Sequence, residues 1–221
     1  MGNDDQMFVD DDEDLREQID QLNLQKEEVL DPATKEQMDT IMKHIQSLKY
    51  GDLSKRVDSL VALNEIISDI QNFKSGMAKC ANDLANAFTH VLVDIFERHL
   101  QEIPLRFAKY FVTIVNKATT CKEIMQEVDY NHVYDLAEQL LTRLLIENLD
   151  KIGENKEGEM ILKNLNASML RLLENCNPTH IFCVLFNLLR KYKDFTVLPK
   201  LPGLIIKCLL KLSKILEKLI D

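Results

Sequence analysis

The chain has 221 residues, of which 46% are apolar, so it can bury a sizeable core. Its formal charge of −9 at pH 7 argues against a whole-chain attraction to nucleic acid or anionic lipid. Six glycines, five prolines and no tryptophan are few for this length, and the scarcity of helix breakers favours long helices over sheets.

Residues 1–31 form an acidic leader with twelve acidic and two basic residues, including the run Asp10-Asp11-Asp12-Glu13-Asp14. Residues 32–221 carry a net charge of +1, so nearly all of the acidity lies in the leader. A run of like charges repels itself and is typical of a solvated segment. We therefore expect a disordered or weakly helical leader, with Ile19 and Leu22 as helix-forming apolar residues, followed by one domain over residues 32–221.

From Asp31 onward, apolar residues recur at helical spacing. Asp31-Pro32 and Asn177-Pro178 each place a capping residue before a proline at the first helical position. The predicted helices span residues 33–48, 56–72, 77–100, 104–117, 131–149, 158–175, 178–192 and 201–219. Taken in consecutive pairs, they form four hairpins of roughly 40–50 residues, the period of HEAT and armadillo solenoids. The predicted fold class is an all-α, HEAT-type helical-hairpin solenoid.

The last two helices differ in pattern. Residues 178–190 are apolar almost all round, which predicts a helix buried by neighbours on more than one side. The final helix carries a basic face formed by Lys207, Lys211, Lys214 and Lys218, while leucines and isoleucines fill its other faces. This face is either a solvated stripe on a packed helix or a contact for a protein partner or an anionic membrane.

Enzymatic chemistry has no recognisable signature in the sequence. No histidine pair has metal-ligand spacing, and there is no glycine-rich phosphate loop and no nucleophile elbow. The five cysteines are Cys80, Cys121, Cys176, Cys183 and Cys208. Their odd number and the absence of a C-x-x-C pair favour free thiols in a reducing compartment over disulfides or a metal site. We expect no enzyme, no cofactor, no metal and no small-molecule substrate.

Membranes and nucleic acids are not expected partners either. The N-terminus is acidic where a signal peptide needs basic residues, and no apolar run approaches the ~20 residues of a membrane span. The domain over residues 32–221 lacks the combination of positive charge and aromatic platforms that nucleic-acid binding requires. The remaining class is a protein-binding module in the cytoplasm or the nucleus.

A family resemblance begins at residue 157 and is carried by several short motifs. These are the Glu157-Gly158 start, the Leu165-Asn166 pair, the Asn177 cap with Thr179, the Leu188-Leu189 pair, Pro199-Lys200-Leu201, and the segment from Leu204 to Leu209. They resemble the C-terminal region of the TOG-domain microtubule polymerases, the ch-TOG and mini spindles family, and most of all its last, atypical TOG-like domain. The likeness extends, more weakly, over residues 33–221.

The resemblance implies HEAT-type helix pairs and a role at microtubules and the mitotic spindle. In this family, tubulin-binding TOG domains place a tryptophan in the first intra-repeat turn, followed by basic residues. Leu53 occupies that position here, and Lys55 and Arg56 keep the basic character. The resemblance thus makes Leu53, Lys55 and Arg56 the candidate contacts with tubulin or another partner, and the missing tryptophan implies weak or no direct tubulin binding.

The family continues with further helices beyond the segment matched by Lys207-Cys208-Leu209, so the domain at 32–221 is expected to lack the family's final helices. The predicted function is a non-enzymatic module that contributes to microtubule dynamics and spindle organisation in the cytoplasm, at microtubules and spindle poles, with tubulin or a spindle-associated protein as partner. One alternative is a generic HEAT-repeat scaffold that binds another protein through the leader or the basic helix. Another is a membrane-surface protein that depends on Lys207, Lys211 and Lys214.

Overall fold

A computed structural model describes residues 31–98, 104–153, 156–193 and 198–220. Over these residues the chain is helical and contains no strand, which confirms the predicted all-α class. Apart from Asp31, the leader falls outside the described residues, and its weak helix and its boundary stay predictions.

Each predicted helix has a counterpart in the structure. The elements are α2 (Pro32–Tyr50), α3 (Leu53–Ser68), α4 (Ile70–Lys79), α5 (Ala81–Val93), the π-helix η1 (Asp94–Arg98), α6 (Leu105–Thr120), α7 (Lys122–Met125), α8 (Tyr130–Arg143), the 3-10 helix η2 (Leu149–Lys151), α9 (Glu157–Asn175), α10 (Pro178–Lys191) and α11 (Leu201–Ile220).

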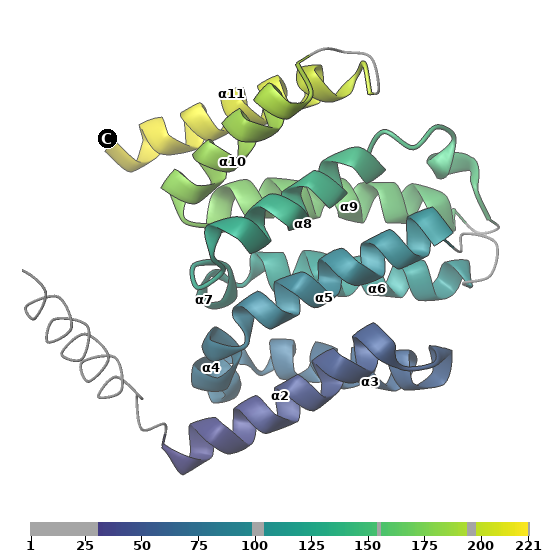
Figure 1. Ribbon diagram of the computed structural model, residues 1–221, viewed down its shortest axis with the longest axis vertical. Helices are drawn as coiled ribbons and strands as arrows, with labels where there is room; N and C mark the ends of the chain where they lie inside the picture. Colours follow the sequence, from purple (N-terminus) through teal and green to yellow (C-terminus); the bar gives the residue numbers. More distant parts are fainter. Residues whose placement is uncertain (1–30, 99–103, 154–155, 194–197, 221) are drawn as a thin grey trace, which may run out of the picture.

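The helices stack in two layers that make four successive hairpins (Figure 1). One layer consists of α2, α5, α8 and α10, each of which packs on the next, and the other consists of α3, α6, α9 and α11. Buried side chains of both layers form one continuous apolar core, in which Phe111 of α6 packs edge-on against Phe88 of α5 and stacks on Phe107. This is the predicted helix-pair solenoid.

Several predicted helix boundaries were wrong, among them the start of the helix expected at 77–100, since α5 begins only at Ala81. The helix expected at 56–72 begins at Leu53 and breaks at Asp69, whose φ of −106° and ψ of 38° lie outside the helical region. A separate helix, α4, follows, and Gly76 lies inside it, against Gln37. The helix expected at 131–149 ends at Arg143, because the chain turns there toward η2.

The prediction that the helix at 178–190 is buried by neighbours on more than one side was right in part, because α10 has three neighbouring helices but one of its faces is exposed. Phe182, Cys183 and Phe186 of α10 are exposed, whereas Ile181, Val184 and Leu185 are buried. The physical reason is position: α10 packs on α8, α9 and α11, and no described helix covers its remaining face. Apolar periodicity shows which faces can be buried, and only the tertiary arrangement shows which of them have a neighbour.

Aspartate N-caps fix the starts of three helices. The carboxylates of Asp31, Asp52 and Asp129 accept hydrogen bonds from the backbone N–H groups of Thr34, Lys55 and His132. Each helix therefore begins where a short acidic side chain can satisfy a free N–H group. For Asp52 and Asp129 this backbone bond is the main reason that the pKa of the carboxyl lies below its ordinary value.

We expect the Asp129 cap to contribute stability that depends on pH. Because its pKa is lowered in the folded state, the contribution is present above about pH 4 and is lost as the pH falls through the folded pKa. Asp129→Ala should cost about 1 kcal/mol at pH 7 and less at pH 3, and Asp129→Asn should retain most of the cap at both. Urea unfolding followed by circular dichroism measures the difference, and an alanine cost that does not change with pH would contradict it.

Candidate protein-binding edge

The intra-repeat turns lie along one edge of the solenoid, on the right of Figure 1. There the C-terminal ends of α2, α5, α8 and α10 turn into their partner helices in the second layer. We call this the turn edge. The predicted contacts Leu53, Lys55 and Arg56 lie on its first turn, between α2 and α3.

Gly51 and Asp52 define the shape of this first turn. A Cβ atom on Gly51 would lie 2.4 Å from the backbone oxygen of Ser47, a distance at which the helix end would have to move. Asp52 caps α3 through the 3.0 Å bond from Lys55 N to its Oδ1. The turn is therefore tight and leads directly into α3.

Arg56 is held inside the protein rather than presented to solvent. Its Nε donates to the carbonyl of Gly51 at 3.1 Å, and its Nη2 donates to the carbonyl of Lys49 at 2.9 Å. The same nitrogen lies 2.8 Å from Asp94 Oδ2 at the start of η1. With 13% of its side chain exposed, Arg56 ties the first turn to the second repeat.

Leu53 and Lys55 are exposed on the outer side of the same turn. Lys55 is 68% exposed and lies 3.5 Å from Asp52 Oδ2, a solvated pair that leaves the ammonium accessible. Tyr50 and Val57, which the sequence reasoning missed, are also exposed here. The i, i+4 spacing of Leu53 and Val57, and a tyrosine directly before the turn glycine, were the signals that could have found them.

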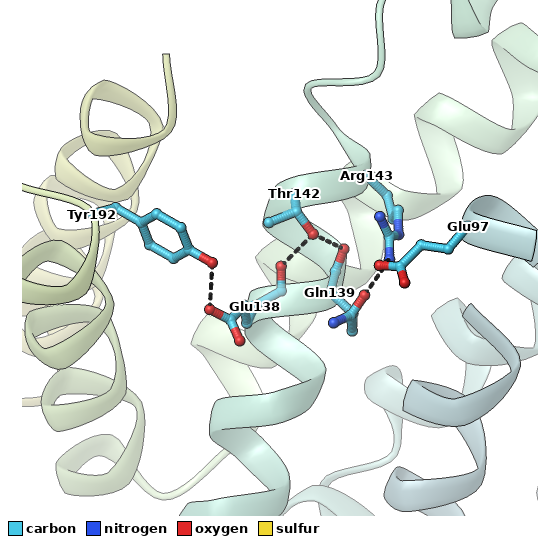
Figure 2. A network of polar contacts seen from close by, with 6 residues as sticks. All are labelled: Glu97, Glu138, Gln139, Thr142, Arg143 and Tyr192. Atoms are coloured by element: carbon cyan, nitrogen blue, oxygen red, sulfur yellow. Dashed lines mark hydrogen bonds and ion pairs between the residues drawn. The ribbon is translucent and has the colours of Figure 1, made fainter. Parts of the chain in front are cut away.

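Further along the turn edge, ion pairs link each repeat to the next (Figure 2). Arg143, at the end of α8, donates from Nη2 to Glu97 of η1 and to Gln139, both at 2.6 Å. Between α8 and α10, Glu138 accepts from Lys191 and from the Tyr192 hydroxyl, both at 2.7 Å. With Arg56 and Asp94, these contacts connect each of the four repeats to the next.

The Glu138 cluster shifts the titration of its neighbours. Burial, together with the hydrogen bond to Glu138, raises the pKa of Tyr192 to about 12. The same carboxylate raises the pKa of Lys191, chiefly through their hydrogen bond. Tyr192 thus stays protonated and Lys191 charged at physiological pH, and the link between α8 and α10 persists.

The predicted basic face lies on α11, in the second layer. Its four lysines are exposed; they are Lys207, Lys211, Lys214 and Lys218. On the same helix Ile205, Cys208 and Leu212 are buried, so the face is the solvent side of a packed helix. The structure does not bring it together with Leu53 and Lys55, which lie in the first repeat.

Away from the turn edge, the described residues form neither a metal cluster nor a disulfide. No group of histidine, cysteine and acidic side chains there could hold a metal ion. All five cysteines are free thiols, and burial raises the pKa of Cys80 and Cys208 to about 11 and that of Cys176 to about 12. Among these residues no helix is long and apolar enough to cross a bilayer.

Fold and edge together define a helical-repeat protein whose turns carry exposed apolar side chains. The chain is 28% identical over 157 residues to Protein MOR1 of Arabidopsis thaliana, covering 65% of this chain and 8% of that relative. It is 27% identical over 171 residues to Protein MOR1 of Oryza sativa subsp. japonica, covering 72% of this chain and 8% of that relative. No family model matches the chain, and no solved structure does.

These matches confirm the resemblance to the TOG-domain microtubule family. The chain is thus similar to a family of microtubule-associated proteins. Because it spans 8% of the length of the curated relatives that it matches, the activity and the partners of those whole proteins come to this chain only as proposals.

Proposed function

We propose that this chain is a non-enzymatic, TOG-like module of the microtubule cytoskeleton that binds tubulin weakly through the first turn of its turn edge. The domain is residues 32–221, preceded by the acidic leader. Leu53 and Lys55 make the contact. The side chain of Arg56 holds the turn in position through its bonds to Gly51, Lys49 and Asp94. The module acts in the cytoplasm, at microtubules and the spindle, and contributes to their organisation through protein contacts.

The exposure of Leu53 and Lys55 on a rigid turn is the observation that carries the proposal. Tyr50 and Val57 enlarge the apolar surface there, and the ammonium of Lys55 suits an acidic protein surface such as that of tubulin. An aliphatic leucine buries less area than a tryptophan anchor, so the contact is weak. The similarity to microtubule-associated relatives supports this choice of partner.

Co-sedimentation with microtubules at low salt tests the proposal. The full chain should enter the pellet, and Leu53→Glu with Lys55→Glu should weaken its affinity about tenfold, or ~1.4 kcal/mol. Lys35→Glu, a charge reversal at an exposed position of the first turn of α2, is the matched control and should leave the affinity unchanged. Equal binding by the double variant and the wild type would remove the first turn from the interface.

A second candidate function is a scaffold that holds a different protein through the leader or through the basic helix. The four exposed lysines on α11 favour it. In that case the chain stays in the supernatant in the microtubule assay. Lys207→Glu with Lys211→Glu then abolishes capture of the partner, while Lys55→Glu does not.

A further inference from the structure

The last helix pair exposes an apolar surface that the proposed function does not use. Phe182 and Phe186 of α10 are 50% and 52% exposed, and Ile206 and Leu210 of α11 are 45% and 60% exposed. The members of each pair are four residues apart and share one side of their helix. Because α10 and α11 pack on each other at the top of the stack in Figure 1, we call the four side chains the end face.

Basic groups border the end face. An open recess of about 460 Å³ at the end of α10 is lined by Asn187, Arg190, Lys191 and Lys193. On α11, Lys207 and Lys211 each follow an end-face residue directly and are exposed. Lys191 is paired with Glu138, whereas the side chains of Arg190 and Lys193 are open to solvent. An occupant should therefore offer apolar side chains next to several negative charges.

The chain itself contains such a segment. Residues 7–14 read Met7-Phe8-Val9 followed by five consecutive acidic residues, Asp10 to Asp14. Three apolar side chains beside five carboxylates match an apolar face beside a basic recess. The chain from Asp14 to Asp31 can span about 55 Å when it is extended. The four stacked hairpins, at ~10 Å spacing, measure about 30 Å from the first to the last. The segment can thus reach the end face of its own chain.

We propose that residues 7–14 bind the end face intramolecularly, with Phe8 against Phe182 and Phe186 and the acidic run along Arg190, Lys193 and Lys207. The contact lies away from Leu53 and Lys55, so it is independent of the proposed tubulin contact. It covers four large apolar side chains that the described residues leave exposed. It also gives the acidic leader a specific docking site.

The alkylation rate of the Cys183 thiol can measure this contact. Cys183 lies on the same side of α10 as Phe186 and Arg190, at i+3 and i+7, and its thiol is exposed. Cys80, Cys176 and Cys208 are buried, and their raised pKa values keep them slow to react. In a Cys121→Ser background, the alkylation rate with uncharged iodoacetamide therefore measures access to Cys183.

The test compares full-length variants. Neutralising the acidic run, with Asp10, Asp11, Asp12 and Asp14 changed to Asn and Glu13 to Gln, should speed alkylation of Cys183 about fivefold or more. Phe8→Ser, which leaves the charge intact, should also speed it. The matched control neutralises five other leader acids, Asp4, Asp5, Glu17, Asp20 and Glu27, and should leave the rate unchanged.

Equal rates in the wild type and the acidic-run variant would overturn the proposal, as would an equal gain in the control. Protection that grows with protein concentration would assign the contact to a second copy and overturn the intramolecular contact. Microtubule co-sedimentation of the same variants separates this proposal from the proposed function, because the first turn is unchanged in all of them. Circular dichroism verifies that each variant is folded.

Discussion

Gly158→Ala is expected to destabilise the fold by about 3 kcal/mol. A Cβ atom on Gly158 would lie 2.0 Å from the carbonyl oxygen of Leu149 and 2.8 Å from that of Ile152. Both atoms belong to the backbone at η2, and the Gly158 N–H itself donates to Ile152 O at 3.1 Å. To remove this steric clash, η2 and the start of α9 must move apart. That movement breaks the hydrogen bond and disturbs the packing of α9 on α6.

Gly203→Ala is the matched control, because a Cβ there meets nothing within 4 Å. It should be neutral or stabilise α11 by up to ~1 kcal/mol through helix propensity. Urea unfolding of both variants gives the comparison. A Gly158→Ala variant within 1 kcal/mol of the wild type would show that the close packing of α9 on η2 is not as described. This packing also gives a physical reason for a glycine directly after Glu157 at the start of α9.

Arg56→Ala should cost about 2–3 kcal/mol, the second-largest effect. It removes the 2.8 Å ion pair with the Asp94 carboxylate, which is only 14% exposed, and leaves the carbonyls of Lys49 and Gly51 without their side-chain donor. Arg56→Lys should recover only part of the loss, because one ammonium cannot reach the three acceptors with the geometry of a guanidinium.

Lys55→Ala is the comparison for Arg56→Ala, since Lys55 is the adjacent basic residue and is exposed. It should change the free energy of unfolding by less than ~0.5 kcal/mol. Similar costs for the two alanine variants, measured by thermal or urea unfolding, would contradict the positioning role of Arg56. If the first turn is the tubulin contact, the order should reverse in binding assays, because Lys55 would touch the partner and Arg56 would act only through the shape of the turn.

The helices and their pairing could be predicted from the sequence because the relevant signals are local. Asp31-Pro32 and Asn177-Pro178 start α2 and α10 as expected, and Pro104 precedes α6. Apolar residues at helical spacing then identify the buried faces. The length of the hairpins was sufficient to predict a two-layer stack, because each pair must bury its apolar sides on a neighbour.

The turn edge could not be predicted in the same way, because its contacts join residues far apart in the chain. Arg56 and Asp94 are 38 residues apart, and Arg143 and Glu97 are 46 apart. Periodicity cannot show which of two adjacent basic residues turns inward. The sequence therefore predicts both Lys55 and Arg56 as partner contacts. Likewise, the apolar composition of α10 did not reveal that one of its sides has no helix against it among the described residues.

Amide hydrogen exchange of the full chain, alone and with excess microtubules, tests the central claim most directly. If the first turn binds tubulin, exchange should slow in peptides that cover residues 50–57 and stay unchanged in peptides from α11. Slowed exchange confined to residues 201–218, or microtubule binding without protection of residues 50–57, would contradict the assignment of the turn edge as the tubulin-binding surface.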